Sequence, residues 1–98
     1  MASVYKTPQA EQDLISIHNY IAEERQDRIN ADRYLKRIED TLEFLATQPR
    51  MGRPRDDLEP GVRFHPFERY LNLFRPVLDG IEVLRILHSS RDIETVMH

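Results

Sequence analysis

Residues 69–92 show the clearest pattern of apolar and polar positions in the chain, and this pattern predicts two strands joined by a tight turn. Asp79-Gly80 separates two apolar runs, and this dipeptide is typical of a type I′ turn because both central residues of such a turn need positive φ. The second run, residues 81–87, is almost continuously apolar, as in a central strand covered on both faces. We therefore expect a small antiparallel sheet with this hairpin at its middle.

Two amphipathic helices are predicted upstream of the hairpin. The first begins at Pro8, with Thr7 as its N-cap, and runs to about Arg25. The second follows Asp27, which can cap it, and ends before Pro49. Spacings of three and four residues place apolar side chains on one face of each helix. These faces carry Ala10, Leu14, Ile17, His18 and Ile21 in the first helix and Ala31, Tyr34, Leu35, Ile38, Leu42 and Leu45 in the second.

Polar residues on these helices suggest structural roles. His18 lies on the apolar face of the first helix, so we expect it in the core as a hydrogen-bonded residue. Asp32 and Lys36 are four residues apart in the favourable orientation for an ion pair. The four histidines of the chain show no metal-ligand spacing, so no metal site is expected.

The remaining segments are short. Residues 4–6 form an extended segment, and residues 62–66 form a strand. Residues 49–61 contain three prolines and two glycines, which predict a connection without regular structure. It is either a solvated surface loop or an arginine-bearing arm that meets an acidic partner. The tail from residue 91 has marginal helical character.

These elements predict an α+β fold, with an N-terminal helical hairpin packed on a small antiparallel β-sheet. The predicted order is β-α-α-β-β-β followed by a short C-terminal helix. With 98 residues, the chain is expected to form a single domain over residues 1–98.

The composition and the absence of known motifs exclude several kinds of chemistry for this chain. The chain has no cysteine, which excludes disulfides, a thiolate nucleophile and Cys-ligated zinc. No apolar stretch approaches the roughly 20 residues of a membrane span, and the N-terminus lacks the layout of a signal peptide. We therefore expect a cytoplasmic protein without membrane contacts. Phosphate-loop, dinucleotide-binding, zinc-protease and hydrolase motifs are all absent, so no cofactor is expected.

The distribution of charge is more informative. The net charge of −3 argues against sequence-independent binding to nucleic acid, where phosphate neutralisation supplies most of the affinity. All eight basic residues of the second half are arginine, which suits bidentate pairing with carboxylate or phosphate, although compositional bias explains it equally well. Arg85 interrupts the most apolar strand, so it needs an acidic partner or an open face. We expect Arg63, Arg75 and Arg85 to project together from the sheet face that lies away from the helices.

A catalytic alternative centres on the end of the last strand. Cleavage of RNA through its 2′-hydroxyl needs a base, an acid and a cation for the developing phosphorane charge. His88, Arg91 and Arg85, with His98, could supply such groups. The simpler interpretation is that His88 is a structural anchor and that Arg91 forms a local ion pair with Asp92.

Three segments together resemble the ParE toxins of the RelE/ParE superfamily. They are AEQDLISIHNYIAEE in the first helix, PRMGRPRDDLEPGVR in the linker, and YLNLFR with DGIEVLRILHSSRDI at the end. The resemblance covers nearly the whole chain. The linker followed by Leu-Arg-aliphatic-Leu-His-x-x-Arg-Asp is its most specific part. It implies the toxin of a type II toxin–antitoxin pair, with the fold deduced above.

The resemblance also implies partners. A ParD-like antitoxin would wrap the toxin across both helices and the sheet in a hetero-oligomer, and DNA gyrase would be the target, without sequence-specific nucleic-acid binding by the toxin alone. We expect antitoxin contacts at Arg63, Arg75, Arg85, Leu14, Ile21 and Leu35, and target contacts at Arg69, His88 and Arg91. RelE-like relatives instead cut mRNA on the ribosome, which would give His88, Arg91 and Arg85 catalytic roles.

The chain departs from the family pattern at three places. Phe64-His65 precede Pro66 where a small residue and Phe are usual, the turn at residues 67–69 lacks a common Gly, and Ser89-Ser90 replace Gly-Ala. These departures keep a third hypothesis open, in which the chain is a non-toxic homologue that only binds a partner.

Overall fold

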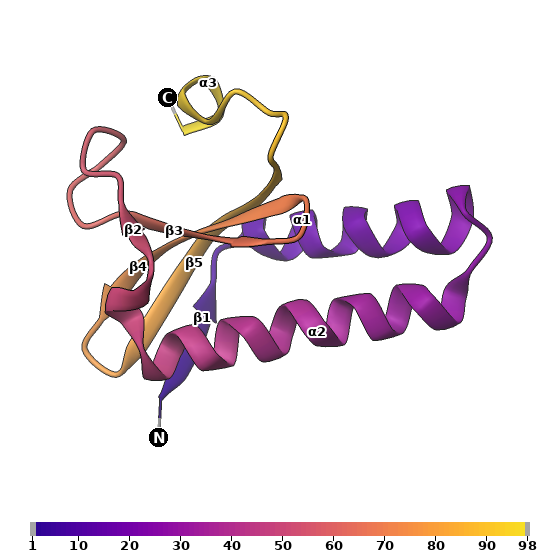
Figure 1. Ribbon diagram of the computed structural model, residues 1–98, viewed down its shortest axis with the longest axis horizontal. Helices are drawn as coiled ribbons and strands as arrows, with labels where there is room; N and C mark the ends of the chain where they lie inside the picture. Colours follow the sequence, from indigo (N-terminus) through magenta and orange to yellow (C-terminus); the bar gives the residue numbers. More distant parts are fainter. Residues whose placement is uncertain (1, 98) are drawn as a thin grey trace.

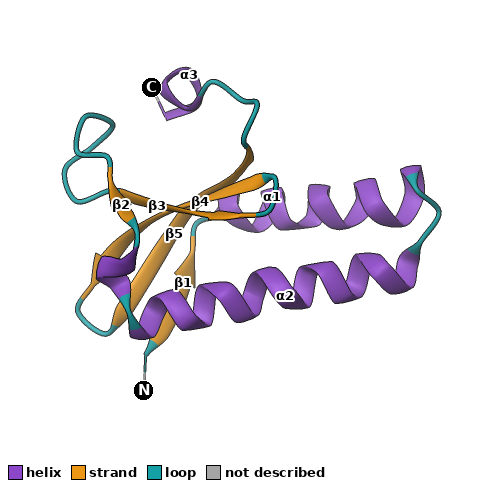
Figure 2. Cartoon of the chain, in the orientation of Figure 1, coloured by secondary structure: helices purple, strands orange, loops and turns teal. Residues whose placement is uncertain are grey.

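The predicted α+β architecture is confirmed by a computed structural model, which describes residues 2–97 (Figure 1). The elements in chain order are β1 (Ser3–Lys6), α1 (Pro8–Asn19), the π-helical turn η1 (Tyr20–Glu24), α2 (Arg28–Thr47), the 3₁₀ turn η2 (Pro49–Met51), β2 (Arg53–Pro54), β3 (Arg63–Phe67), β4 (Tyr70–Val77), β5 (Gly80–His88) and α3 (Ile93–Met97). The hairpin of α1 and α2 extends well beyond the edge of the sheet, and α3 lies on the other side of the sheet (Figures 1 and 2).

The sheet has the strand order β1-β5-β4-β3-β2, so the β4–β5 hairpin lies at its middle as expected. The expectation of a purely antiparallel sheet is wrong, because β1 pairs with β5 in parallel while the other pairs are antiparallel. Gly80 makes this pairing possible, since a Cβ atom there would lie 1.9 Å from the carbonyl oxygen of Ser3. The strands β1 and β5 therefore approach each other more closely than any side chain at position 80 would allow.

The turn of the central hairpin is shifted by one residue from its predicted place. Val77 pairs with Gly80, so the two turn residues are Leu78 and Asp79 rather than Asp79 and Gly80. Neither Leu78 nor Asp79 has positive φ, so the turn is not of type I′. Asp79 instead accepts a hydrogen bond of 2.7 Å from the Tyr5 hydroxyl, which joins the turn to β1.

Both predicted helix caps are present. Thr7 Oγ1 accepts the Ala10 amide at 3.1 Å, and Asp27 Oδ1 accepts the Asn30 amide at 3.1 Å. Each cap of this kind is worth about 1 kcal/mol. The Thr7 hydroxyl also donates to the Leu84 carbonyl at 2.8 Å, which places the start of α1 directly beside β5.

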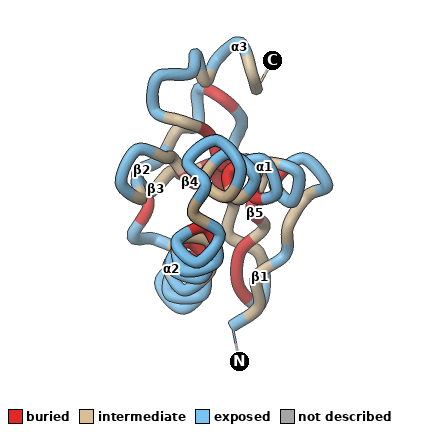
Figure 3. The backbone as a smooth tube through the Cα atoms, turned by 90° about the vertical axis from the view of Figure 1, so that its right-hand side faces the viewer, coloured by how far each residue is buried: buried red, intermediate tan, exposed pale blue. Residues whose placement is uncertain are grey.

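The core has two parts, one on each face of the sheet, and the buried positions are red in Figure 3. The larger part lies between the helical hairpin and the sheet and confirms the predicted helix faces. It contains Ala10, Leu14, Ile17, Ile38, Leu42, Leu45, Ala46, Phe74, Ile81, Val83 and Ile86. The smaller part contains Leu58, Val62, Leu73 and Leu87, and three residues of α3 pack against it. The strand β5 is therefore covered on both faces, as its continuous apolar run predicts.

The polar residues of the helices pair differently from the prediction. His18 is not in the core, because its side chain keeps 26% exposure and its Nε2 atom lies 2.7 Å from Asp32 Oδ1. Lys36 consequently pairs with Asp40 at 2.6 Å rather than with Asp32. The His18–Asp32 contact joins α1 to α2, a link between elements that the local i,i+4 rule does not consider.

The linker of residues 49–61 has more structure than expected. It contains η2 and β2, and β2 pairs with β3. Leu58 anchors the linker because it is 3% exposed and belongs to the smaller core. Within residues 2–97, no helix combines the length and the apolar character needed to cross a membrane.

Candidate functional site

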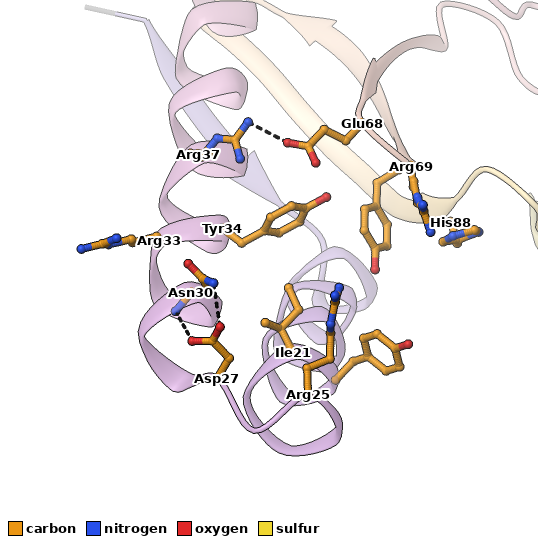
Figure 4. A pocket seen from close by; sticks show the side chains of 12 residues that line it. Ile21, Arg25, Asp27, Asn30, Arg33, Tyr34, Arg37, Glu68, Arg69 and His88 are labelled. Carbon is orange, nitrogen blue, oxygen red and sulfur yellow. Dashed lines mark hydrogen bonds and ion pairs between the residues drawn. The ribbon is translucent and has the colours of Figure 1, made fainter.

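A cleft of about 990 Å³ opens where the helical hairpin extends past the sheet (Figure 4). One wall is η1 and the first half of α2. The other wall is the β3–β4 turn with the end of β5. Four arginines line the cleft, at positions 25, 33, 37 and 69, against two carboxylates, Asp27 and Glu68. This local excess of positive charge contrasts with the net charge of −3 of the whole chain.

Aromatic rings connect the two walls. The rings of Tyr34 and Tyr70 meet edge to face, with centroids 6.1 Å apart. Tyr34 makes a similar contact with Phe67 at 5.5 Å, and Tyr70 makes one with His88 at 5.5 Å. Burial raises the pKa of both Tyr34 and Tyr70, so their hydroxyls stay protonated and can donate hydrogen bonds. Such ring pairs are worth roughly 0.5–1.5 kcal/mol each beyond the area that they bury.

The rim of the cleft has unusual backbone geometry. The turn η1 is π-helical. This conformation is rare in proteins overall, but where it occurs it is often at a functional site. Gln26 and Glu68 are the only non-glycine residues in the range 2–97 with positive φ, at 51° and 52°. Gln26 directly precedes the capping residue of α2, and Glu68 occupies the β3–β4 turn. Strained backbone of this kind clusters at binding sites, where the surrounding structure maintains it.

The three predicted target-contact residues come together at this end of the molecule. Arg69 and His88 line the large cleft, and His88 and Arg91 line a smaller neighbouring cleft of about 190 Å³. Tyr20 and Tyr70 separate the two clefts and line both. The sequence had indicated Arg69, His88 and Arg91 as site residues. It had not indicated that Tyr20, Arg25 and Tyr34 contribute to the same site. Those three lie on the helices, and only the tertiary fold brings them near the sheet end.

His88 is held by its own turn. Its Nδ1 atom accepts the Ser90 amide at 3.2 Å and lies 2.7 Å from Ser90 Oγ. An Nδ1 atom that accepts the amide belongs to the neutral tautomer whose ring hydrogen is on Nε2. The predicted ion pair between Arg91 and Asp92 does not form. Asp92 instead caps α3, because its carboxylate accepts the Thr95 hydroxyl at 2.8 Å and the Glu94 amide at 3.1 Å.

Arg85 has a different position from the one expected. Its guanidinium forms a bidentate pair with Asp13 of α1, at 2.8 and 3.0 Å, so the expectation that it projects away from the helices is wrong. Asp13 also accepts the Ile86 amide at 2.9 Å. One carboxylate therefore satisfies both the half-buried guanidinium of Arg85 and the backbone amide of Ile86, on the part of β5 that does not pair with β1.

The other two sheet arginines also have partners within the chain. Arg63 donates to the carbonyl oxygens of Gly52, at 2.7 Å, and Arg50, at 3.3 Å. Arg75 pairs with Glu82 at 2.8 Å and approaches Glu59 at 4.0 Å. Arg63 therefore ties the linker to β3, and Arg75 ties β4 to β5.

The predicted apolar contacts fall in two groups. Leu14 is 6% exposed and belongs to the larger core, so it offers no surface to a partner. Ile21 and Leu35 are half-buried and pack against that core, and Ile21 also lines the large cleft. His98 lies outside the described residues. Across residues 2–97, no three His, Asp or Glu side chains gather in a way that could hold a metal ion.

Comparisons with known proteins agree with the resemblance seen in the sequence. The sequence profile of the family described as "ParE toxin of type II toxin-antitoxin system, parDE" matches residues 4–93. The chain belongs to the ParE toxin family. The toxin ParE3 of Caulobacter vibrioides is 32% identical over 93 residues, which cover 95% of this ParE chain and 92% of that protein.

Two further relatives extend the comparison. The toxin ParE1 of Mycobacterium tuberculosis is 31% identical over 65 residues, and the match spans 65% of this ParE chain and 66% of that protein. A solved structure of the chromosomal ParDE toxin–antitoxin system from P. aeruginosa superposes with a TM-score of 0.71 at 26% identity. It covers 90% of this ParE chain and 96% of the other chain, so the likeness includes the helical hairpin and the sheet together.

Proposed function

We propose that this ParE chain is a toxin that is held inactive by a ParD-like antitoxin and that, once released, inhibits DNA gyrase without catalytic residues of its own. Membership of the ParE family and the likeness to a ParDE structure support the toxin role and the antitoxin partner. Gyrase as the target follows from the resemblance to the ParE branch.

The Arg85–Asp13 pair is the observation that supports action without catalysis. RNA cleavage at the end of β5 would need cations free to act beside His88, and Arg85 and Arg91 were the candidates. The guanidinium of Arg85 is instead neutralised and oriented by a helix carboxylate. His88 and Arg91 line the same small cleft, but Arg85 does not line it, so the three residues considered for RNA cleavage do not all converge within the described part of the chain.

The first experiment expresses the chain alone and together with the small open reading frame next to its gene. We expect growth arrest with the chain alone and rescue with co-expression, and we expect the two proteins to co-purify. Purified chain should then inhibit gyrase supercoiling or trap gyrase-linked DNA breaks. Growth arrest with normal gyrase activity would count heavily against the target, and normal growth would favour the binding-only homologue.

The ribonuclease alternative is supported by one observation. His88, Arg69 and Tyr70 gather at one end of the cleft, and the imidazole carries its hydrogen on the nitrogen that Ser90 leaves unbound. The test is an mRNA cleavage assay in a translating extract with wild-type chain and a His88→Ala variant. Cleavage that the variant abolishes would support the ribonuclease, whereas intact message with both proteins would rule it out.

A further inference from the structure

Three of the four arginines that line the cleft, Arg25, Arg33 and Arg69, have no ion pair or side-chain hydrogen bond among residues 2–97. Arg25 lies at the end of η1, and Arg69 lies in the β3–β4 turn. By contrast, Arg37 in the same cleft pairs with Glu68 at 2.6 Å. Figure 4 shows the side chain of Arg25 pointing from its own wall toward the opposite wall, where Arg69 lies beside His88, while Arg33 points away from the cleft. Two like charges that approach one open space favour an anion between them.

Apolar and hydrogen-bonding groups surround this space. Ile21 projects into the cleft beside Arg25 (Figure 4), and the protonated hydroxyls of Tyr34 and Tyr70 are available as donors. Tyr20 is 56% exposed at the edge of the cleft. A ligand that combines an anionic group with an apolar neighbour would therefore be better matched than a free inorganic anion.

A protein segment matches these features better than a nucleic acid. Tyr70 contacts the rings of Tyr34 and His88 edge to face, so among the rings that line the cleft only Tyr20 lies outside this cluster, and the cleft offers few free ring faces for base stacking. The chain carries a net charge of −3, which would repel an extended polyanion outside the cleft. A single carboxylate between Arg25 and Arg69 meets the local positive charge without that penalty.

We propose that this cleft binds an acidic segment of the ParD-like antitoxin, with one carboxylate held between Arg25 and Arg69 and an adjacent apolar side chain packed against Ile21. The proposal rests on the antitoxin partnership put forward above and names the site of that contact. We had expected the antitoxin to contact Arg63, Arg75 and Arg85, but these residues have partners within the chain. Arg25 and Arg69 have none among residues 2–97, so we place the electrostatic contact there. The bound segment would also cover Arg69 and His88, so the antitoxin would block the residues expected to contact the target.

The test measures affinity for the co-purifying antitoxin by calorimetry at about 150 mM salt. Arg25→Glu and Arg69→Glu should each weaken binding by at least about tenfold, because each places a carboxylate where the ligand's carboxylate sits. Arg53→Glu is the matched control. Arg53 is an exposed arginine on β2, outside the cleft and without an ion pair in the described chain. It should bind within about twofold of wild type.

Two further measurements make the result decisive. Thermal melts of the three variants should match wild type, because the substituted side chains are exposed and form no ion pair or side-chain hydrogen bond among residues 2–97. Lysine substitutions of the antitoxin's acidic residues, taken one at a time, should include one that restores binding to Arg69→Glu while it weakens binding to the wild-type chain and to Arg53→Glu. Recovery by such a charge reversal identifies the direct partner and excludes an indirect effect on folding.

Each other outcome counts against the proposal. Antitoxin binding that all three variants retain would overturn the site while leaving the toxin–antitoxin pairing intact. Absence of binding by the wild-type chain would overturn the pairing and the site together. A ten-nucleotide oligouridylate that binds wild type tightly, but neither cleft variant, would assign the cleft to RNA instead.

Discussion

Arg37 of α2 and Glu68 of the β3–β4 turn form an ion pair of 2.6 Å, and Glu68 holds it from a left-handed backbone conformation with φ of 52°. The guanidinium of Arg37 also lies over the rings of Tyr34 and Phe67, at 5.9 and 5.2 Å from their centroids. The turn is therefore fixed to the helix by charge and by ring contacts at the same point. This attachment sets the direction in which the following residues, Arg69 and Tyr70, enter the cleft.

The backbone at position 68 gives the first prediction. Glu68→Gly and Glu68→Ala both remove the ion pair, but only glycine adopts positive φ without steric cost. We expect the glycine variant to be more stable than the alanine variant by about 1 kcal/mol in urea denaturation. Equal stabilities would show that the turn relaxes out of the left-handed region once the ion pair is lost. The family resemblance anticipates a glycine in this turn, and Glu68 is the residue that takes the conformation a glycine would favour.

The second prediction concerns Asp13. Asp13→Ala would leave the Arg85 guanidinium without its partner and the Ile86 amide without an acceptor, so we expect a loss of about 2–4 kcal/mol in the free energy of unfolding. Asp40→Ala is the control, because Asp40 forms an exposed pair with Lys36 and should cost less than about 0.5 kcal/mol. Chemical denaturation of the two variants makes the comparison. Similar small losses would mean that water replaces Asp13 at little cost.

The features that the sequence predicted correctly are those set by local rules. Thr7 and Asp27 cap the helices because a cap depends on residues within one turn, and the faces marked by Leu14 and Ile38 follow the helical repeat. The apolar run of β5 likewise indicated a strand covered on both faces. Each of these inferences needs only neighbours along the chain.

The features that were missed depend on contacts between distant segments. Arg85 turns to α1 because Thr7 places that helix beside β5, and because Arg85 continues the alternation of Ile81 and Val83, which face the helices. The parallel pairing of β1 was missed for the same reason. The approach of Arg25 and Arg69 to one cleft requires the full tertiary arrangement, and neither residue is unusual in its local sequence.

Gly80 gives the third prediction. Gly80→Ala should cost at least about 2 kcal/mol of stability, because the new Cβ would meet the backbone of Ser3 rather than a movable side chain. Gly61→Ala is the matched control. Position 61 also has positive φ, of 84°, but nothing lies within 4 Å of the added Cβ, so the cost there should be about 1 kcal/mol. Hydrogen exchange should show the β1 amides losing protection in Gly80→Ala only. Retained protection in that variant would mean that β1 shifts without detaching.

The Tyr5–Asp79 hydrogen bond gives the fourth prediction, which concerns pH. The bond lowers the pKa of Asp79 below its usual 3.8, so the stability it contributes is present above pH 3.8 and is lost as pH falls through the lower folded-state value. The same bond raises the pKa of Tyr5 above 10.0, so that contribution is present below pH 10.0 and is lost as pH rises through the higher folded-state value. Tyr5→Phe removes the bond and isolates its effect from the other titrating groups. The stability difference between wild type and Tyr5→Phe should be constant from about pH 5 to 9 and should shrink at both extremes. A difference that persists at acid pH would show that the contact does not depend on the ionised carboxylate, and that Tyr5 joins β1 to the hairpin turn by packing alone.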